Sequence, residues 1–88
     1  AYRSQFQYSQ AIDSYRKALG KFTRYKNDYF SGRVLLLLAR CFCDMGMAEK
    51  AREYLSRAEE ICSKFNEPLI MGRIKNYEAN IHLLEQDY

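Results

Sequence analysis

The sequence contains no long uncharged hydrophobic run. Its most apolar stretch, Val34 to Ala39, is six residues long and lies between Arg33 and Arg40. A helix that spans a bilayer needs about 20 such residues. The opening AYRSQFQYSQ also lacks the basic head and apolar stretch of a secretory signal. We therefore expect neither a membrane span nor export.

Cysteine is scarce as well. Cys41, Cys43 and Cys62 are an odd number and do not have the spacing of a disulfide framework. Such usage is typical of a reducing compartment. The sequence therefore favours the cytoplasm, with the nucleus as the alternative.

Residues that carry chemistry are nearly absent, since the chain has one His and no Gly-rich phosphate loop, nucleophile elbow or paired carboxylates in an apolar setting. The one candidate metal set is His82 with Cys41 and Cys43. A Cys-Phe-Cys spacing on a helix, however, directs the two sulfurs about 200° apart. We expect no enzyme activity, no cofactor and no metal, and we expect His82 to be a structural residue that aligns with a buried Phe42.

Charge of either sign is not in large excess. The formal net charge is +3, from 14 basic and 11 acidic residues, which does not by itself indicate nucleic acid. One basic run with interleaved rings resembles an RNA-binding surface, and comprises Arg16, Lys17, Lys21, Phe22, Arg24, Tyr25 and Lys26. Because Phe22 and Tyr25 continue an apolar stripe, we assign the rings to the core and the bases to a solvated face. RNA binding is therefore the less favoured alternative.

What the chain does contain is an internal repeat. A shift of forty residues aligns several features without a gap. It places Ala11 on Ala51, Ala18 on Ala58, Tyr25 on Phe65, Gly32-Arg33-Val34 on Gly72-Arg73-Ile74, and Ala39 on Ala79. The chain therefore contains related units rather than one irregular domain.

Helical periodicity fills the intervals between these matches. Apolar residues recur at alternating spacings of three and four, as in Tyr8, Ile12, Tyr15, Leu19 and Phe22, in Ala51, Leu55, Ala58, Cys62 and Phe65, and in Ile70, Ile74, Tyr77, Ile81, Leu84 and Tyr88. Turns are predicted at Lys26-Asn27-Asp28, at Asp44-Met45-Gly46 and before Pro68. The sequence predicts an all-α fold with helices near 7–25, 28–45, 47–65 and 67–86.

The middle unit resembles the tetratricopeptide repeat, a helix-turn-helix unit that stacks into an α-solenoid. The first-helix positions of the family match Leu35, Leu38, Ala39 and Phe42, the turn matches Gly46, and the second-helix positions match Ala51, Leu55 and Ala58. The resemblance divides the chain into a second helix (1–27), a complete repeat (28–66) and the first helix of a third repeat (67–88). The forty-residue spacing is similar to the long repeats of kinesin light chain, rapsyn and LGN, whereas Lys75 and Glu78 depart from the apolar pattern.

The resemblance also explains how four consecutive leucines are accommodated. A first helix that lies between its own partner and the preceding repeat is covered on more than one side. We therefore expect Leu35, Leu37 and Leu38 to be buried. Leu36 is expected to face the concave groove.

By the same register, the groove is lined by Arg33, Leu36, Arg40, Cys43, Asp44, Arg73, Asn76, Asn80 and Leu83. Arginine suits forked binding of carboxylates. The resemblance therefore implies a protein-protein interaction module that binds a partner peptide or helix, with an acidic segment as one fitting chemistry. The alternatives are a structural segment buried in a larger assembly and the RNA-binding reading. Because no polar capping helix is visible, we expect further repeats of the same chain to flank this one.

Overall fold

The computed structural model describes the backbone of residues 5–86 and the side chains from residue 7 to residue 86. Within this range the chain forms four helices and no strand: α1 (Gln5–Arg24), α2 (Asp28–Asp44), α3 (Ala48–Cys62) and α4 (Pro68–Gln86). These bounds lie within three residues of the predicted ones. The all-α class is therefore confirmed.

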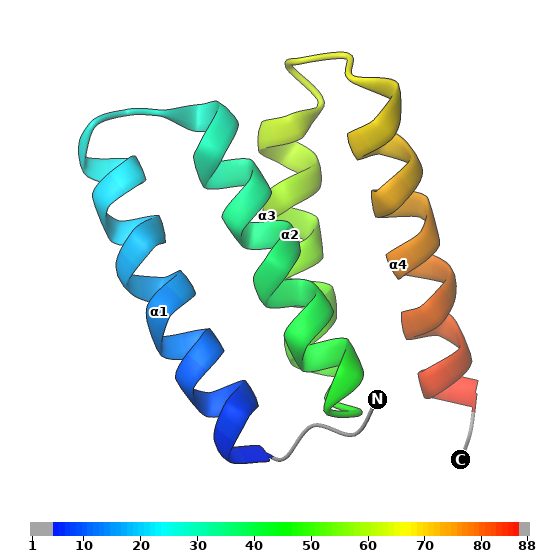
Figure 1. Cartoon of the computed structure of the whole chain (residues 1–88). Helices are drawn as coiled ribbons and strands as arrows, with labels where there is room; N and C mark the ends of the chain where they lie inside the picture. The colour runs from blue at the N-terminus through cyan, green and yellow to red at the C-terminus, as the bar shows by residue number, and fades with distance from the viewer. Residues whose placement is uncertain (1–4, 87–88) are drawn as a thin grey trace.

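The helices form consecutive antiparallel hairpins (Figure 1). Each helix packs on the next, and α2 also contacts α4. Helix α2 consequently has neighbours on three sides, which makes it the most buried helix. This arrangement explains why the most leucine-rich segment of the sequence forms α2.

The turns recur every twenty residues, which is half of the forty-residue sequence repeat. Lys26, Gly46 and Asn66 have positive φ values of 56°, 77° and 47° and lie twenty residues apart. Such a left-handed residue ends a helix and reverses the chain. The backbone therefore repeats every helix-turn unit of twenty residues, and two such units make the forty-residue repeat.

The first two turns use the same hydrogen bonds. The Asn27 N–H donates to the Phe22 carbonyl at 2.8 Å, and the Met47 N–H donates to the Phe42 carbonyl at 2.8 Å. Both are the long closing bond of a Schellman motif. The Asn27 side chain also accepts from the Phe30 N–H at 3.3 Å and therefore caps the start of α2.

The core follows the predicted stripes in the middle of the chain. The side chains with almost no exposure come chiefly from α2 and α3, and include Leu35, Leu38, Ala39, Ala51, Leu55, Ala58 and Cys62. Helix α4 adds Ile70, Ile74 and Ile81. The stripe of α1 contributes Ile12 fully and its other members partly.

The predicted burial of Leu37 is wrong. Leu37 is 36% exposed, whereas Leu36 is 5% exposed. The open face of α2 carries Arg33, Leu37, Arg40 and Asp44, all exposed and spaced four, three and four residues apart. Leu37 belongs to this stripe, whereas the neighbouring Leu36 is buried and lines the space between α2 and α4.

Three further residues that were expected in the core are exposed. Tyr25 is 78% exposed because α1 ends at Arg24, and Phe65 is 39% exposed because α3 ends at Cys62. Each ring therefore sits in a turn rather than on a helical stripe. His82 is also exposed, whereas Phe42 stacks on Tyr54 of α3 at a ring distance of 5.4 Å. His82 occupies the position of α4 that corresponds to Phe42 in α2. No described helix packs on that position as α3 packs on Phe42, so the structural role expected for His82 is not supported.

Gly32 and Gly72, which the repeat aligns, differ in their surroundings because α3 packs on α2 at Gly32 and no described helix packs on α4 at Gly72. A Cβ atom on Gly32 would lie 2.7 Å from the Cys62 Sγ and 3.2 Å from the Ile61 Cγ2. A Cβ atom on Gly72 would meet nothing within 4 Å. Gly32 thus permits the close approach of α2 and α3, while Gly72 lies on the open side of α4.

We expect Gly72→Ala to raise the free energy of unfolding by up to about 1 kcal/mol, because alanine is the better helix former. At Gly32 the same gain is opposed by overpacking against Cys62, which costs about 1 to 3 kcal/mol. Urea denaturation of both variants measures the difference. Equal stabilisation by the two substitutions would show that α2 and α3 do not approach closely at Gly32.

Candidate functional site

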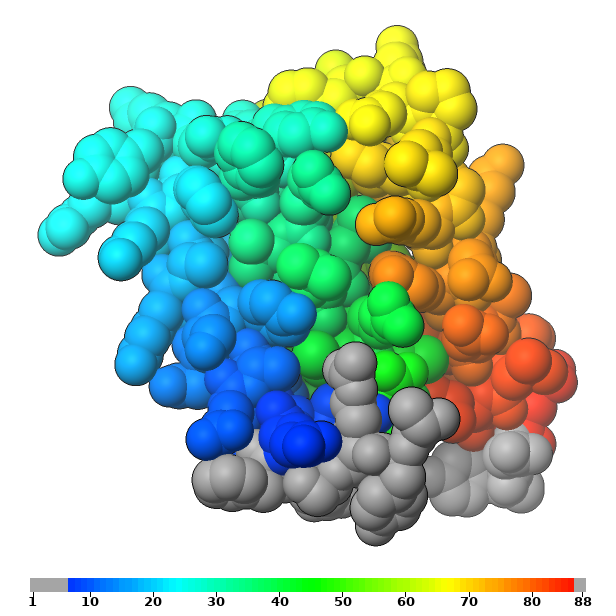
Figure 2. Space-filling model, in the orientation of Figure 1, coloured from blue at the N-terminus to red at the C-terminus, as the bar shows by residue number. Residues whose placement is uncertain are grey.

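A groove runs between α2 and α4. It consists of two adjoining cavities of about 180 Å³ and 420 Å³ that share Arg73 and Tyr77. In Figure 2 the green surface of α2 meets the orange surface of α4 along this face. The first cavity is lined by Arg33, Leu36, Leu37, Glu67, Leu69, Ile70, Arg73 and Tyr77, and the second by Arg40, Cys43, Asp44, Arg73, Asn76, Tyr77 and Asn80.

The first cavity is the apolar half of the groove. The buried Leu36 and Ile70 contribute to its lining, and the exposed Leu37 and Leu69 flank them, with Leu69 64% exposed. Arg33 from α2 and Arg73 from α4 line the same cavity. An apolar side chain of a partner would be buried here close to two positive charges.

The second cavity is the polar half. The Arg40 Nε lies 4.0 Å from an Asp44 carboxylate oxygen, and both side chains are largely exposed, so this ion pair is weak. Burial, followed by the Asp44 charge, raises the pKa of Cys43. The Cys43 thiol therefore lines the groove in its protonated form and is not an activated nucleophile.

Tyr29 connects two groove residues, Arg33 and Glu67, at the end of the groove where α2 begins. The Tyr29 hydroxyl donates to the Glu67 carboxylate at 2.9 Å, and this bond is the main reason that the pKa of Tyr29 is raised. The Arg33 guanidinium lies 5.9 Å from the centre of the Tyr29 ring. These contacts connect the start of α2 with the α3–α4 turn and orient Arg33 beside the cavity.

The structure brings together every residue that the repeat register assigned to the groove except Leu83. Arg33, Leu36, Arg40, Cys43, Asp44, Arg73, Asn76 and Asn80 all line one of the two cavities. Leu83 is 63% exposed and lines neither cavity. Sequence reasoning missed Leu37, Glu67, Leu69 and Tyr77. The four-three-four spacing of the exposed α2 stripe would have identified Leu37.

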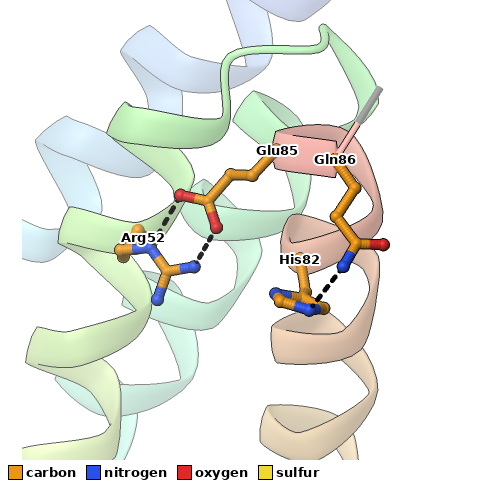
Figure 3. A network of polar contacts seen from close by, with 4 residues as sticks. All are labelled: Arg52, His82, Glu85 and Gln86. Carbon is orange, nitrogen blue, oxygen red and sulfur yellow. Dashed lines mark hydrogen bonds and ion pairs between the residues drawn. The ribbon is translucent and has the colours of Figure 1, made fainter. Parts of the chain in front are cut away.

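A second polar cluster lies between α3 and α4 (Figure 3). Arg52 forms a two-bond ion pair with Glu85, and the ring of His82 contacts the Gln86 side chain at 3.1 Å. Arg52 and His82 also line a cavity of about 410 Å³, together with Glu59 and Glu78. A hydrogen bond with Glu78, followed by burial and the Glu78 charge, raises the pKa of Glu59.

Among residues 5–86, no group of three or more His, Cys, Asp or Glu side chains is placed to hold a metal ion. No helix in the same range is long and apolar enough to cross a membrane. The α2–α4 groove is therefore the site with the clearest binding chemistry.

Stacked helical hairpins with an open groove between alternate helices define a helical-repeat protein. The family model of the tetratricopeptide repeat matches residues 1–64. The chain belongs to the tetratricopeptide repeat family, whose members generally mediate protein-protein interactions. No curated protein and no solved structure gives a significant match to the chain.

We expect Glu59→Gln to raise the melting temperature at neutral pH, because it removes one of two facing carboxylates. The folded-state pKa of Glu59 is raised above the unfolded value of about 4.3. The folded state therefore takes up a proton first as the pH falls, and the penalty disappears below the unfolded pKa. Thermal melts of Glu59→Gln and wild type between neutral and acidic pH measure this.

The matched control is Glu53→Gln, on an exposed position of the same helix, which should leave the melt nearly unchanged. The advantage of Glu59→Gln should shrink steadily as the pH falls. A constant or growing advantage at acidic pH would contradict the facing-carboxylate account.

Proposed function

We propose that the chain binds an extended segment of a protein partner in the α2–α4 groove. The observation that carries this proposal is the alignment of two exposed polar faces across one groove. Arg33, Leu37, Arg40 and Asp44 come from α2, and Arg73, Asn76 and Asn80 come from α4. Membership in a family of interaction modules supports the same function.

The chemistry of the groove favours an acidic segment with an apolar side chain. The Arg73 side chain makes no hydrogen bond or ion pair with any described residue, so its guanidinium is available to a carboxylate. Asn76 and Asn80 offer amide groups that pair with an extended backbone. Leu37 and Leu69 are placed to cover an apolar side chain at the other end.

A structural role in a larger assembly is the second candidate. Gly72 and Ala79 lie exposed on α4, although their repeat equivalents Gly32 and Ala39 are buried against neighbouring helices. These small residues would allow another helix of an assembly to pack closely and permanently on α4. The two candidates differ in whether groove substitutions change partner binding without changing assembly.

For cellular context we propose the cytoplasm, with the nucleus as the alternative, and no catalytic role. The three cysteines are all free thiols. Burial is the main cause of the raised pKa values of Cys43 and Cys62. Thiols in this state are poor nucleophiles, which supports a binding rather than a catalytic role.

We expect Arg40→Ala and Arg73→Ala each to weaken binding of the partner by about tenfold, because a hydrogen bond to a charged group contributes about 1.5 to 3 kcal/mol. The melting temperature should hardly change, since both side chains are exposed. A photoreactive side chain at Leu37 identifies the partner segment by cross-linking, and calorimetric titration of that segment measures the affinities.

The matched control is Lys75→Ala, which removes a positive charge from an exposed position of α4 that lines neither groove cavity. It should leave the affinity unchanged. Equal losses for Lys75→Ala and Arg73→Ala would indicate general charge attraction and exclude the groove as the site.

A further inference from the structure

The α1–α2 turn carries an exposed surface that the groove does not use. We call it the turn patch, and it consists of Lys21, Arg24, Tyr25, Lys26 and Phe30. Tyr25 is 78% exposed and Phe30 is 43% exposed. In Figure 2 the cyan side chains of this turn project from the body of the molecule at the upper left, apart from the surface where α2 and α4 meet.

The ring of Phe30 is fixed by its neighbours. It stacks on Phe22 at a centroid distance of 5.3 Å and meets Tyr29 edge to face at 5.4 Å. Tyr29 in turn contacts Phe65 at 5.5 Å. A ring that is already immobilised loses little conformational entropy when a partner covers it, which makes it an efficient anchor.

The positive charges of the patch are not neutralised. The side chains of Lys21, Arg24 and Lys26 form no hydrogen bond or ion pair with any residue in the described range. Asp28, which follows the turn in the sequence, pairs with Lys64 at 3.4 Å instead. The turn therefore presents three unpaired cations beside two exposed rings.

We propose that the turn patch is a second interaction surface, which binds an acidic protein segment carrying an apolar or aromatic anchor. Charge complementarity selects the acidic segment, and the exposed rings of Tyr25 and Phe30 select the anchor. Tyrosine and arginine are the residues enriched among interface hot spots. None of its residues lines the groove, so the chain would hold two partner segments or two parts of one partner.

Cations beside exposed rings are also typical of surfaces that bind single-stranded nucleic acid. Assigning Tyr25 to the core was the reason to set RNA binding aside, and its exposure removes that reason. Three unpaired cations in a chain of net charge +3 are nevertheless few for a surface that follows a phosphate backbone. The tetratricopeptide repeat family generally binds proteins, and the patch is therefore assigned to a protein segment.

The test is a fluorescence anisotropy titration with three labelled probes. The first is a short peptide of glutamates around one central Leu-Phe pair, the second has Ala-Ala in place of that pair, and the third is an oligouridylate of similar length. All titrations use the Arg40→Ala/Arg73→Ala double variant, in which binding to the groove is weakened. Failure of the patch is thereby separated from failure of the groove.

We expect the Leu-Phe peptide to bind most tightly. Tyr25→Ala, and separately the double change Lys21→Gln/Lys26→Gln, should each weaken it by about fivefold or more. Tyr25→Phe should retain most of the affinity because it keeps the ring. The matched charge control is Lys50→Gln/Lys75→Gln, two exposed lysines outside the patch, which should change little. Circular dichroism melts verify that each variant folds.

Three results would overturn the proposal. Equal binding of the Ala-Ala peptide would show charge attraction without an anchor. Tighter binding of the oligouridylate, lost in the Tyr25 and lysine variants, would identify a nucleic-acid surface. Absence of peptide binding in this folded background, or equal losses in the Lys50→Gln/Lys75→Gln control, would show that the patch is an ordinary solvated turn.

Discussion

The close approach of α2 and α3 is the contact on which the rest of the structure depends. At one end of this contact Gly32 leaves room for the Cys62 sulfur, and at the other Phe42 stacks on Tyr54. The fully buried Ala39 of α2 lies between these two contacts along the helix. Small residues let the helices approach, so that the leucines on the other faces of α2 can reach α1 and α4.

This contact determines where the binding surfaces lie. With α2 covered by α1, α3 and α4, a single stripe remains open, and it carries Arg33, Leu37, Arg40 and Asp44. The turns at intervals of twenty residues return α4 to the side of α2 that this stripe borders. The groove is thus a consequence of helix length and turn spacing. The turn patch has another origin, because α1 ends at Arg24 and leaves Tyr25, the next residue of its apolar stripe, exposed in the turn.

Periodicity predicted the four helices and the buried members of α2 and α3, because those features depend on local spacing and on contacts within the hairpin. It also selected the groove residues Arg73, Asn76 and Asn80 through the repeat register. It failed at Leu37, which lies on the exposed face of α2 that no described helix covers. Tyr25 and Phe65 were misassigned because a stripe continues in the sequence after the helix has ended. His82 was misassigned because its repeat equivalent Phe42 is covered by α3, and no described helix covers α4 in that way.

The central claim is that small residues set the spacing of α2 and α3, and Ala39 tests it most directly because its repeat equivalent, Ala79, is exposed. The measurement is the free energy of unfolding of Ala39→Leu and Ala79→Leu in urea. The account predicts a loss of about 1 to 3 kcal/mol or more for Ala39→Leu, from overpacking, and almost no loss for Ala79→Leu. A loss of only a few tenths of a kcal/mol at Ala39 would contradict it.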